Sequence, residues 1–451
     1  MAVRDAVGRG DSARPTASLP ARPGSRARRR PLTVLLPLFG SGLVVMLADT
    51  DAGSLITASQ SGASWGYRMV LPQLILVPIL YVVQEMTVRL GVLTGTGHGA
   101  LIRARFGRGW AVLSAGTLFL SAIGALITEF AAVAGVGELF GVSRWLTIPV
   151  ATALLIGLAL TGSHRRVERI GIALGLAELA FLPAMLLGHP SARALAHGLV
   201  SLPMSHGSYR YLLAANVGAV IMPWMVFYQQ GAVTDKGVDA TRIRRERAGT
   251  LVGAVVTQVV MIAVVITVAA TIGRQHPDAS LGTVGQISAA LRPSLGVVGA
   301  KVLFGAGMLG AALVAALVSS LAGAWGLAEI FGWQHTLNAR PGRKTAKFYL
   351  SYALAHVAGA VLVLASVDLI GLSIDAEVMN ALLLPIVLGF LLALEARALP
   401  AAHRMRGGRK YLSWALCLLV MGFGLYLIPS TLGLLRTPRP GGIGHPPFIL
   451  C

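Results

Sequence analysis

Apolar segments long enough to cross a lipid bilayer take up most of this chain of 451 residues. A spanning helix needs about 20 mostly apolar residues. We identify eleven such segments, at 33–58, 69–93, 111–140, 144–162, 170–189, 211–233, 249–273, 297–330, 347–371, 376–396 and 411–435. Only 12% of the residues are charged, about half the share in a soluble domain. We therefore predict an all-α polytopic membrane protein with eleven transmembrane helices, and not an enzyme.

The basic residues predict how the chain is oriented. Lys and Arg number 38 against 18 Asp and Glu, and most of them lie in the N-terminal tail and in the loops that follow even-numbered spans. Because basic loops stay on the cytoplasmic side, we expect a cytoplasmic N-terminus and an extracytoplasmic C-terminus in the cytoplasmic (inner) membrane. The net charge of +20 then reflects topology and contact with lipid, and not nucleic-acid binding.

The ends of the chain differ from its centre. Residues 1–32 are rich in Arg, Pro, Ser and Gly, and we predict a disordered basic cytoplasmic tail. Residues 33–435 form the predicted transmembrane domain, and 436–451 form a short extracytoplasmic tail. The two cysteines, Cys417 and Cys451, are too few for a disulfide scaffold or a cysteine metal site. We expect no resident cofactor and no obligate protein partner.

Two spans are interrupted by residues that disfavour a continuous helix. In the first span, the run Asp49-Thr50-Asp51-Ala52-Gly53-Ser54 breaks an apolar segment. Carboxylates are expensive inside a membrane and usually face a protein interior or a water path. An unwound segment here would expose carbonyl groups beside the carboxylates, which suits a cation. The alternative is a polar kink satisfied by neighbouring helices.

The second interruption is in the sixth span, where Met222 and Pro223 follow Ala219 in an apolar run. Proline cannot bond the carbonyl four residues earlier, so the Ala219 carbonyl is free to face a ligand. Alone, this pattern is also typical of a kinked core helix. Paired with the first break it indicates two five-helix repeats of opposite direction, with a transport site at mid-membrane.

The residues at both breaks resemble the NRAMP family of divalent metal transporters. The family's first-span motif, Asp-Pro-Gly-Asn, reads Asp51-Ala52-Gly53-Ser54 here. Its sixth-span motif, Ala-x-x-Met-Pro-His, reads Ala219-Val220-Ile221-Met222-Pro223-Trp224. Stretches at 89–95 and 319–323 are also similar, and the resemblance extends from about Gly40 to about Leu427.

The resemblance implies a LeuT-like fold, with inverted repeats formed by spans 1–5 and 6–10, and import of manganese or iron by alternating access. It also implies that the metal is the transported substrate and that a soft thioether selects transition metals over calcium and magnesium. The implied ligands are the Asp51 carboxylate, Ser54 at the asparagine position, the Ala219 carbonyl and the Met222 sulfur. Members are often proton-coupled, and Asp49 and Glu129 are the candidates for a proton or ion path.

Several departures mark a divergent branch of the family. Both sixth-span histidines are replaced, by Trp224 and Gln229, which weakens the expectation of ordinary proton coupling. Leu383 stands where we place the tenth-span glutamine, and Asn380, one turn earlier, is the candidate substitute ligand. The other reading of Asn380 is a polar group in helix packing.

Three alternatives remain open at this point. The chain could be a magnesium-selective relative, or a transporter of an organic solute with the same fold, although Asp51 would repel an anionic substrate. A membrane hydrolase with Asp49 and Asp51 as an acid pair is a third reading, but such dyads usually draw on two segments. The sequence contains no nucleotide-binding loop of the G-x-x-x-x-G-K-[ST] type, so transport would be driven by an ion or metal gradient.

Overall fold

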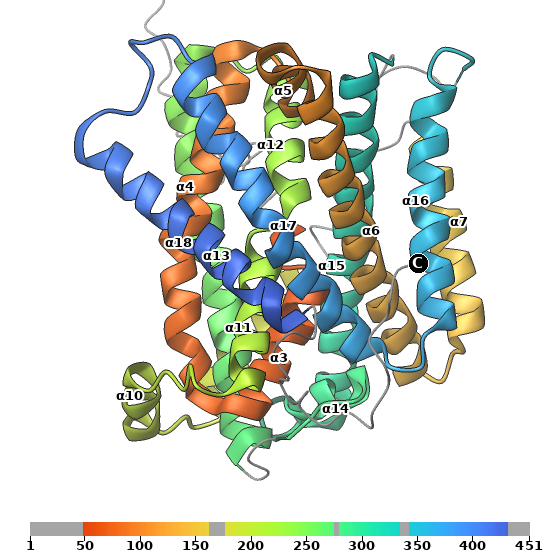
Figure 1. The fold of residues 1–451 in the computed structure, drawn as a ribbon. Coiled ribbons are helices and arrows are strands. Elements are labelled where there is room, and N and C mark those ends of the chain that lie inside the picture. Colours follow the sequence, from red (N-terminus) through yellow and green to blue (C-terminus); the bar gives the residue numbers. More distant parts are fainter. Residues whose placement is uncertain (1–47, 162–175, 275–278, 334–341, 432–451) are drawn as a thin grey trace, which may run out of the picture. The chain divides into compact units, whose positions relative to one another are not determined.

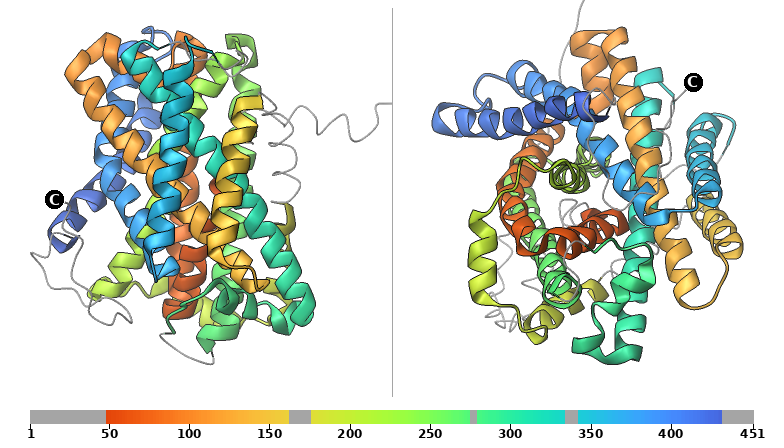
Figure 2. Two further views of the ribbon diagram at one scale, coloured as in Figure 1. Left: turned by 90° about the vertical axis from the view of Figure 1, so that its right-hand side faces the viewer. Right: turned by 60° about the horizontal axis from the view of Figure 1, so that its bottom comes forward.

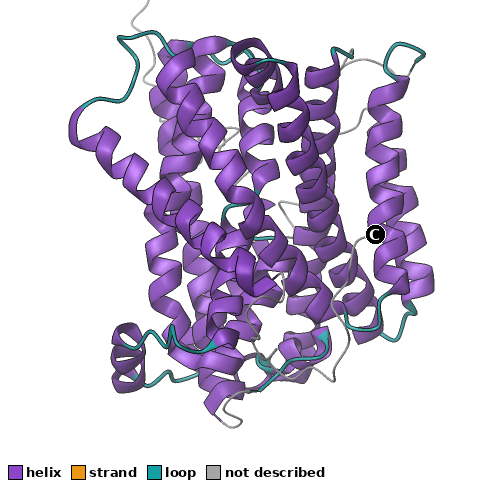
Figure 3. Ribbon diagram, in the orientation of Figure 1, coloured by secondary structure: helices purple, strands orange, loops and turns teal. Residues whose placement is uncertain are grey.

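The computed structural model describes residues 48–161, 176–274, 279–333 and 342–431, all within one unit that spans 38–451. These described residues form helices, turns and loops, and no strand (Figure 3). The predicted tails, 1–32 and 436–451, lie outside the described residues. So do 33–47 of the first predicted span and 170–175 of the fifth.

The helices follow one another in the order of the predicted spans (Figure 1). Their bounds are α3 Ala52–Trp65, η2 Gly66–Met69, α4 Val70–Thr94, α5 His98–Phe106, α6 Arg108–Leu139, α7 Arg144–Thr161, η3 Leu176–Ala180, α9 Phe181–Leu187, α10 Ala192–Val200, α11 Gly207–Val220, α12 Pro223–Asp235, η4 Ala240–Arg242, α13 Ile243–Val268, η5 Ala269–Gly273, α14 Val284–Ala289, α15 Arg292–Phe331, α16 Ala346–Ala365, α17 Leu369–Ala398 and α18 Gly407–Thr431.

Eight helical segments of the described chain are long and apolar enough to cross a membrane. The first of them, Ala52–Thr94, contains the end of the predicted first span and the whole second span. Two shorter apolar helices, Arg144–Leu160 and Glu178–Leu187, lie at the fourth and fifth predicted spans. The all-α membrane architecture is confirmed. The number of eleven spans stays a prediction, because parts of the first and fifth lie outside the described residues.

Helix α3 lies at the centre of the described helices and packs against α6, α11, α13 and α17 (Figures 1 and 2). Every residue of α3 except Trp65 is buried. The helix is rich in Ala, Gly and Ser, small residues that let neighbouring helices approach closely in a membrane. Helix α18 lies farther out, against α17 and α4. The polar residues of α3 therefore face other helices and not lipid.

One predicted boundary is wrong, that between the ninth and tenth spans. The sequence placed the connection between 371 and 376, but α16 ends at Ala365 and α17 begins at Leu369. Asp368 caps α17, its carboxylate accepting a hydrogen bond of 2.8 Å from the amide of Gly371. The apolar run alone did not locate this cap, which sets the start of the helix. As a result Glu377 lies inside the helix.

A partly buried charge cluster joins four helices. Glu85 and Arg89 of α4 form the ion pair expected from their i, i+4 spacing, at 3.9 Å. Glu85 also pairs with Arg247 of α13 at 2.8 Å and with Arg409 of α18 at 2.5 Å. Arg89 in turn lies 3.6 Å from Glu395 of α17. The cluster ties α18 to the helices around α3.

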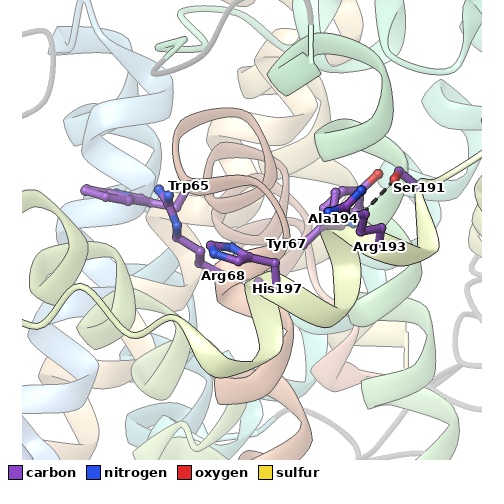
Figure 4. A pocket seen from close by; sticks show the side chains of 8 residues that line it. Trp65, Tyr67, Arg68, Ser191, Arg193, Ala194 and His197 are labelled. Carbon is purple, nitrogen blue, oxygen red and sulfur yellow. Dashed lines mark hydrogen bonds between the residues drawn. The ribbon is translucent and has the colours of Figure 1, made fainter.

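A surface pocket of about 490 Å³ lies between η2 and α10 (Figure 4). Its walls carry the aromatic rings of Trp65 and Tyr67 and the basic side chains of Arg68, Arg193 and His197. None of the site residues predicted from the sequence lines it. The two helix breaks that carry the predicted site residues are therefore separate from this pocket.

Candidate metal-binding site

The first break is present where the sequence predicted it. Ala48 and Asp49 are helical, Thr50 and Asp51 are not, and α3 begins at Ala52. Asp51 is the N-cap of α3, with extended backbone angles, and its Oδ1 accepts a hydrogen bond of 2.7 Å from the amide of Ser54. A carboxylate is favoured at a helix N-terminus because it pairs with free amides and with the positive end of the helix dipole.

The second break is also present, between α11 and α12. Helix α11 ends at Val220, and Ile221 and Met222 have non-helical angles before Pro223 opens α12. Proline suits the first turn of a helix, where its missing donor costs nothing. In Figure 1, α11 and α12 follow one another lengthwise with the break between them. The predicted interruption of the sixth span is confirmed.

Ser54 connects the two breaks. Its hydroxyl lies 3.0 Å from the carbonyl oxygen of Asp49 and 3.1 Å from that of Ala219, and it donates to both in turn. The Ala219 carbonyl is the one that Pro223 cannot bond within the helix. The freed carbonyl of the sixth span thus accepts a hydrogen bond from a residue of the first break.

Several carboxylate oxygens at the first break have no hydrogen-bond partner within the described structure. These are both oxygens of Asp49 and Oδ2 of Asp51, and both residues are 1% exposed or less. Buried polar groups are nearly always satisfied, so exceptions need a physical reason. A bound cation or a proton would satisfy these unpaired carboxyl oxygens in a water-poor interior.

Met222 does not have a free sulfur. The indole Nε1 of Trp224 donates a hydrogen bond of 3.1 Å to Met222 Sδ, and both side chains are fully buried. Trp224 occupies the position of the first family histidine, so this contact is a property of the divergent sequence. Gln229, at the second histidine position, is also buried, and neither side-chain polar atom has a described partner.

Glu129 of α6 reaches the start of α3. Its Oε2 accepts a hydrogen bond of 3.4 Å from the amide of Ala52, and its Oε1 accepts one of 3.2 Å from the Thr128 hydroxyl. The structure therefore brings Glu129 beside the Asp51 cap, from a helix 77 residues away in the chain. The sequence had placed it near the site only through the family resemblance.

Glu377 of α17 is a site residue that sequence reasoning missed. It is fully buried; its Oε2 accepts a hydrogen bond of 3.0 Å from the Asn380 side-chain amide, while its Oε1 has no described partner. Asn380, the predicted tenth-span ligand, has its carbonyl oxygen occupied by the Ser121 hydroxyl at 2.8 Å. Of these two residues of α17, Glu377 and not Asn380 therefore has an oxygen without a described hydrogen-bond partner.

Two glycines let Glu377 lie between the breaks. A Cβ atom at Gly53 would be 2.2 Å from Glu377 Oε1, and a Cβ at Gly218 would be 1.8 Å from the Glu377 carbonyl oxygen. Gly53 follows Asp51 in the first break, and Gly218 precedes Ala219 in the second. Only a residue without a side chain permits so close an approach. Glu377 is thereby placed next to both interrupted segments.

Glu178 of η3 is a second buried acid that the sequence did not assign to the site. It is 4% exposed, lies against Thr50 of the first break, and has an Oε1 without a described partner. Five carboxylates thus surround the first break: Asp49, Asp51, Glu129, Glu178 and Glu377. None of the ion pairs found in the described residues involves them.

The family model described as natural resistance-associated macrophage protein-like, or Nramp, matches residues 42–430. The chain belongs to the Nramp family. Among its curated relatives, the divalent metal cation transporter MntH of Verminephrobacter eiseniae is 27% identical over 326 residues, covering 68% of this chain and 71% of the relative. MntH of Pectobacterium carotovorum is 28% identical over 316 residues, covering 67% and 75%.

Solved structures confirm the LeuT-like fold of this Nramp chain. The manganese transporter of Eremococcus coleocola superposes with a TM-score of 0.72 at 19% identity, covering 93% of this chain and 91% of that one. MhsT in complex with L-phenylalanine gives 0.59 at 13% identity, covering 86% and 98%. A sodium-coupled sialic acid symporter gives 0.57 at 15% identity, covering 89% and 91%.

The predicted ligands of this Nramp site are not equally available. Within the described residues, no three His, Cys, Asp or Glu side chains are close enough to hold a metal ion together. The predicted ligand set accordingly combines one carboxylate with three neutral donors. Asp51 offers Oδ2, whereas Ala219 and Met222 are each engaged by one hydrogen bond, from Ser54 and Trp224. Ala219 and Met222 would each bind a metal only through the lone pair that this hydrogen bond leaves, or after the bond opens.

Proposed function

We propose that this Nramp chain is a secondary transporter that imports divalent metal ions, of the manganese and iron class, across the cytoplasmic membrane. The metal binds between the two helix breaks, to the Asp51 carboxylate, the Ala219 carbonyl, the Met222 sulfur and the Ser54 hydroxyl. The metal is substrate, and the protein needs no other bound group. The MntH relatives, named as divalent metal cation transporters, support this assignment.

The observation that carries the proposal is the link between the breaks. Ser54 of the first break donates to the Ala219 carbonyl of the second, and the unpaired Oδ2 of Asp51 belongs to the same unwound segment. Interrupted helices at corresponding positions of two repeats are where transporters of this fold bind substrate. A divalent cation would compensate the buried charge, which an anionic solute would increase. An organic anion is therefore disfavoured as substrate.

Alternating access then follows from the position of the site. The breaks lie between helices of both repeats, so moving one helix group against the other exposes the same ligands to either side in turn. The basic loops support an N-terminus inside the cell and a C-terminus outside. Inward transport is driven by an ion gradient or by the metal gradient itself.

Asp49 and Glu129 are proposed as the path for a coupled proton or ion. Both lie beside Asp51: Asp49 directly precedes the unwound residues, and Glu129 is hydrogen-bonded to the first amide of α3. Asp49 has two unpaired oxygens and offers a place for a proton when the metal is absent. This arrangement would replace the role of the histidines that Trp224 and Gln229 have displaced.

Magnesium is the second candidate substrate. Glu377 and Asp49 add unpaired carboxylate oxygens next to the site, while the one sulfur ligand is engaged by Trp224. Magnesium and manganese prefer oxygen ligands, whereas softer metals gain most from sulfur. These features favour the oxygen-preferring end of the divalent series.

Uptake by proteoliposomes tests the proposed function. The purified full chain would be reconstituted, and the entry of Mn²⁺, Fe²⁺ and Mg²⁺ measured with a dye inside the vesicles. We expect at least one of these ions to enter faster than in empty vesicles, and Asp51→Ala to reduce that rate to the empty-vesicle level. Asp239→Ala serves as the control, because this carboxylate is exposed in a loop. Equal uptake by Asp51→Ala and wild type would refute the site.

A further inference from the structure

The sulfur of Met222 has a fixed partner. Met222 is extended, with φ −81° and ψ 135°, and Pro223 then starts α12, so the side chain of Trp224 folds back toward the break. The result is the hydrogen bond of 3.1 Å from the indole Nε1 to Met222 Sδ. Both side chains are fully buried, and Trp224 is the largest fully buried side chain of the described chain.

The indole group has one N–H donor and no acceptor, and a buried indole N–H needs a partner. In the described structure the partner of Trp224 is the thioether. A metal that binds Sδ would compete for the same sulfur electrons and would bring positive charge toward the N–H. Leaving one buried donor unpaired lowers affinity roughly tenfold. Metals that bind mainly through oxygen avoid this cost.

We propose that Trp224 determines metal selectivity at this site by holding the Met222 sulfur in an N–H···S hydrogen bond. The bond disfavours sulfur-preferring cations such as Cd²⁺ and leaves oxygen-preferring cations such as Mn²⁺ and Mg²⁺ unaffected. The inference rests on the proposed function, since it assumes that the metal binds beside Met222. Trp224 acts through the methionine and is a positioning residue, not a ligand.

Titration calorimetry on the purified full chain tests this role. Trp224→Phe removes the N–H and keeps an aromatic ring. We expect the Kd for Cd²⁺ to fall about tenfold, because the sulfur becomes available at no cost, and the Kd for Mn²⁺ to change by less than about twofold. Trp325→Phe is the matched control, a buried tryptophan of α15 that stacks on Tyr228 of α12. It should leave both affinities unchanged.

A double-mutant comparison separates the sulfur from general repacking. In a Met222→Leu background no thioether is present, so Trp224→Phe should no longer tighten Cd²⁺ binding. Persistence of the gain in that background would overturn the proposal, as would equal shifts for Cd²⁺ and Mn²⁺. These outcomes differ from failure of the proposed function, in which Asp51→Ala would bind both metals as tightly as wild type.

The proposal stays testable if Trp224→Phe does not fold. Met222→Leu alone then decides it. A sulfur that is hydrogen-bonded to the indole is a weakened ligand for Cd²⁺, so Met222→Leu should weaken Cd²⁺ binding by less than about twofold. A loss of tenfold or more would mean that the sulfur is a full ligand in the presence of the indole, and would overturn the proposal.

Discussion

Gly218→Ala should force apart two helices that position the site. The added Cβ would lie 1.8 Å from the Glu377 carbonyl oxygen and 2.8 Å from the Ala381 amide nitrogen. Both are backbone atoms of α17, so no side-chain rotation relieves the clash. Because nonbonded heavy atoms normally stay about 3.5 Å apart, α11 and α17 would have to separate by roughly 1.5 Å.

The separation has a stability cost and a functional cost. Overfilling a packed interior costs about 1–3 kcal/mol, so the thermal midpoint in detergent should fall. The carbonyl of Ala219, the next residue, moves with the backbone and leaves the Ser54 hydroxyl, which now lies 3.1 Å away. A displacement of about 1 Å in a binding constellation can lower a rate roughly a hundredfold. We therefore expect Mn²⁺ uptake per reconstituted molecule to drop by at least tenfold.

The control for this variant is Gly157→Ala in α7. A Cβ at Gly157 meets no atom within 4 Å, and alanine in a helix is more stable than glycine by about 0.5–1 kcal/mol. Gly157→Ala should therefore keep its uptake and its thermal midpoint, or raise the latter. If Gly218→Ala also matched wild type in both measurements, the close contact between α11 and α17 would not be what holds the two breaks in place.

Two further substitutions test the carboxylate and hydroxyl groups of the site. Glu377→Gln removes one buried charge and should weaken Mg²⁺ and Mn²⁺ binding on the order of tenfold, as measured by calorimetry. The control Asp375→Asn, at an exposed position of the same helix, should leave both affinities unchanged. Equal affinities in the two variants would place Glu377 outside the site. Ser54→Ala removes the hydroxyl donor shared by two carbonyls and should lower the free energy of unfolding by about 1 kcal/mol. The measurement is the thermal midpoint, which should fall. An unchanged midpoint would show that the breaks do not depend on this hydroxyl.

Both helix breaks could be predicted because local chemistry creates them. Pro223 removes a donor wherever it stands, so the Ala219 carbonyl had to lose its helical partner, and the structure gives it Ser54 instead. The first break combines a capping carboxylate, Asp51, with the flexible Gly53 and the hydroxyl of Ser54 within four positions. Such residues begin a helix more readily than they continue one. Such signals need no tertiary information.

The part of the site from α17 could not be predicted because packing decides it. The predicted tenth span, 376–396, puts Glu377 at its second residue. Helix α17 begins at Leu369 because Asp368 caps it, which carries Glu377 two turns into the bundle. Its approach to the breaks depends on the absence of side chains at Gly53 and Gly218. The sequence alone does not show which residue packs against each glycine.

The charges around the first break constrain the substrate more than any single ligand does. Asp49, Asp51 and Glu377 all carry buried oxygens without a described partner, and the three lie on segments that meet at the breaks. Burying several like charges without compensation is unfavourable by many kcal/mol. One divalent ion offsets two of the three carboxylates, whereas a monovalent ion offsets one and a zwitterion, which has no net charge, offsets none. The count of unpaired carboxylates therefore favours a divalent cation even where the softer Nramp ligands have been lost or occupied.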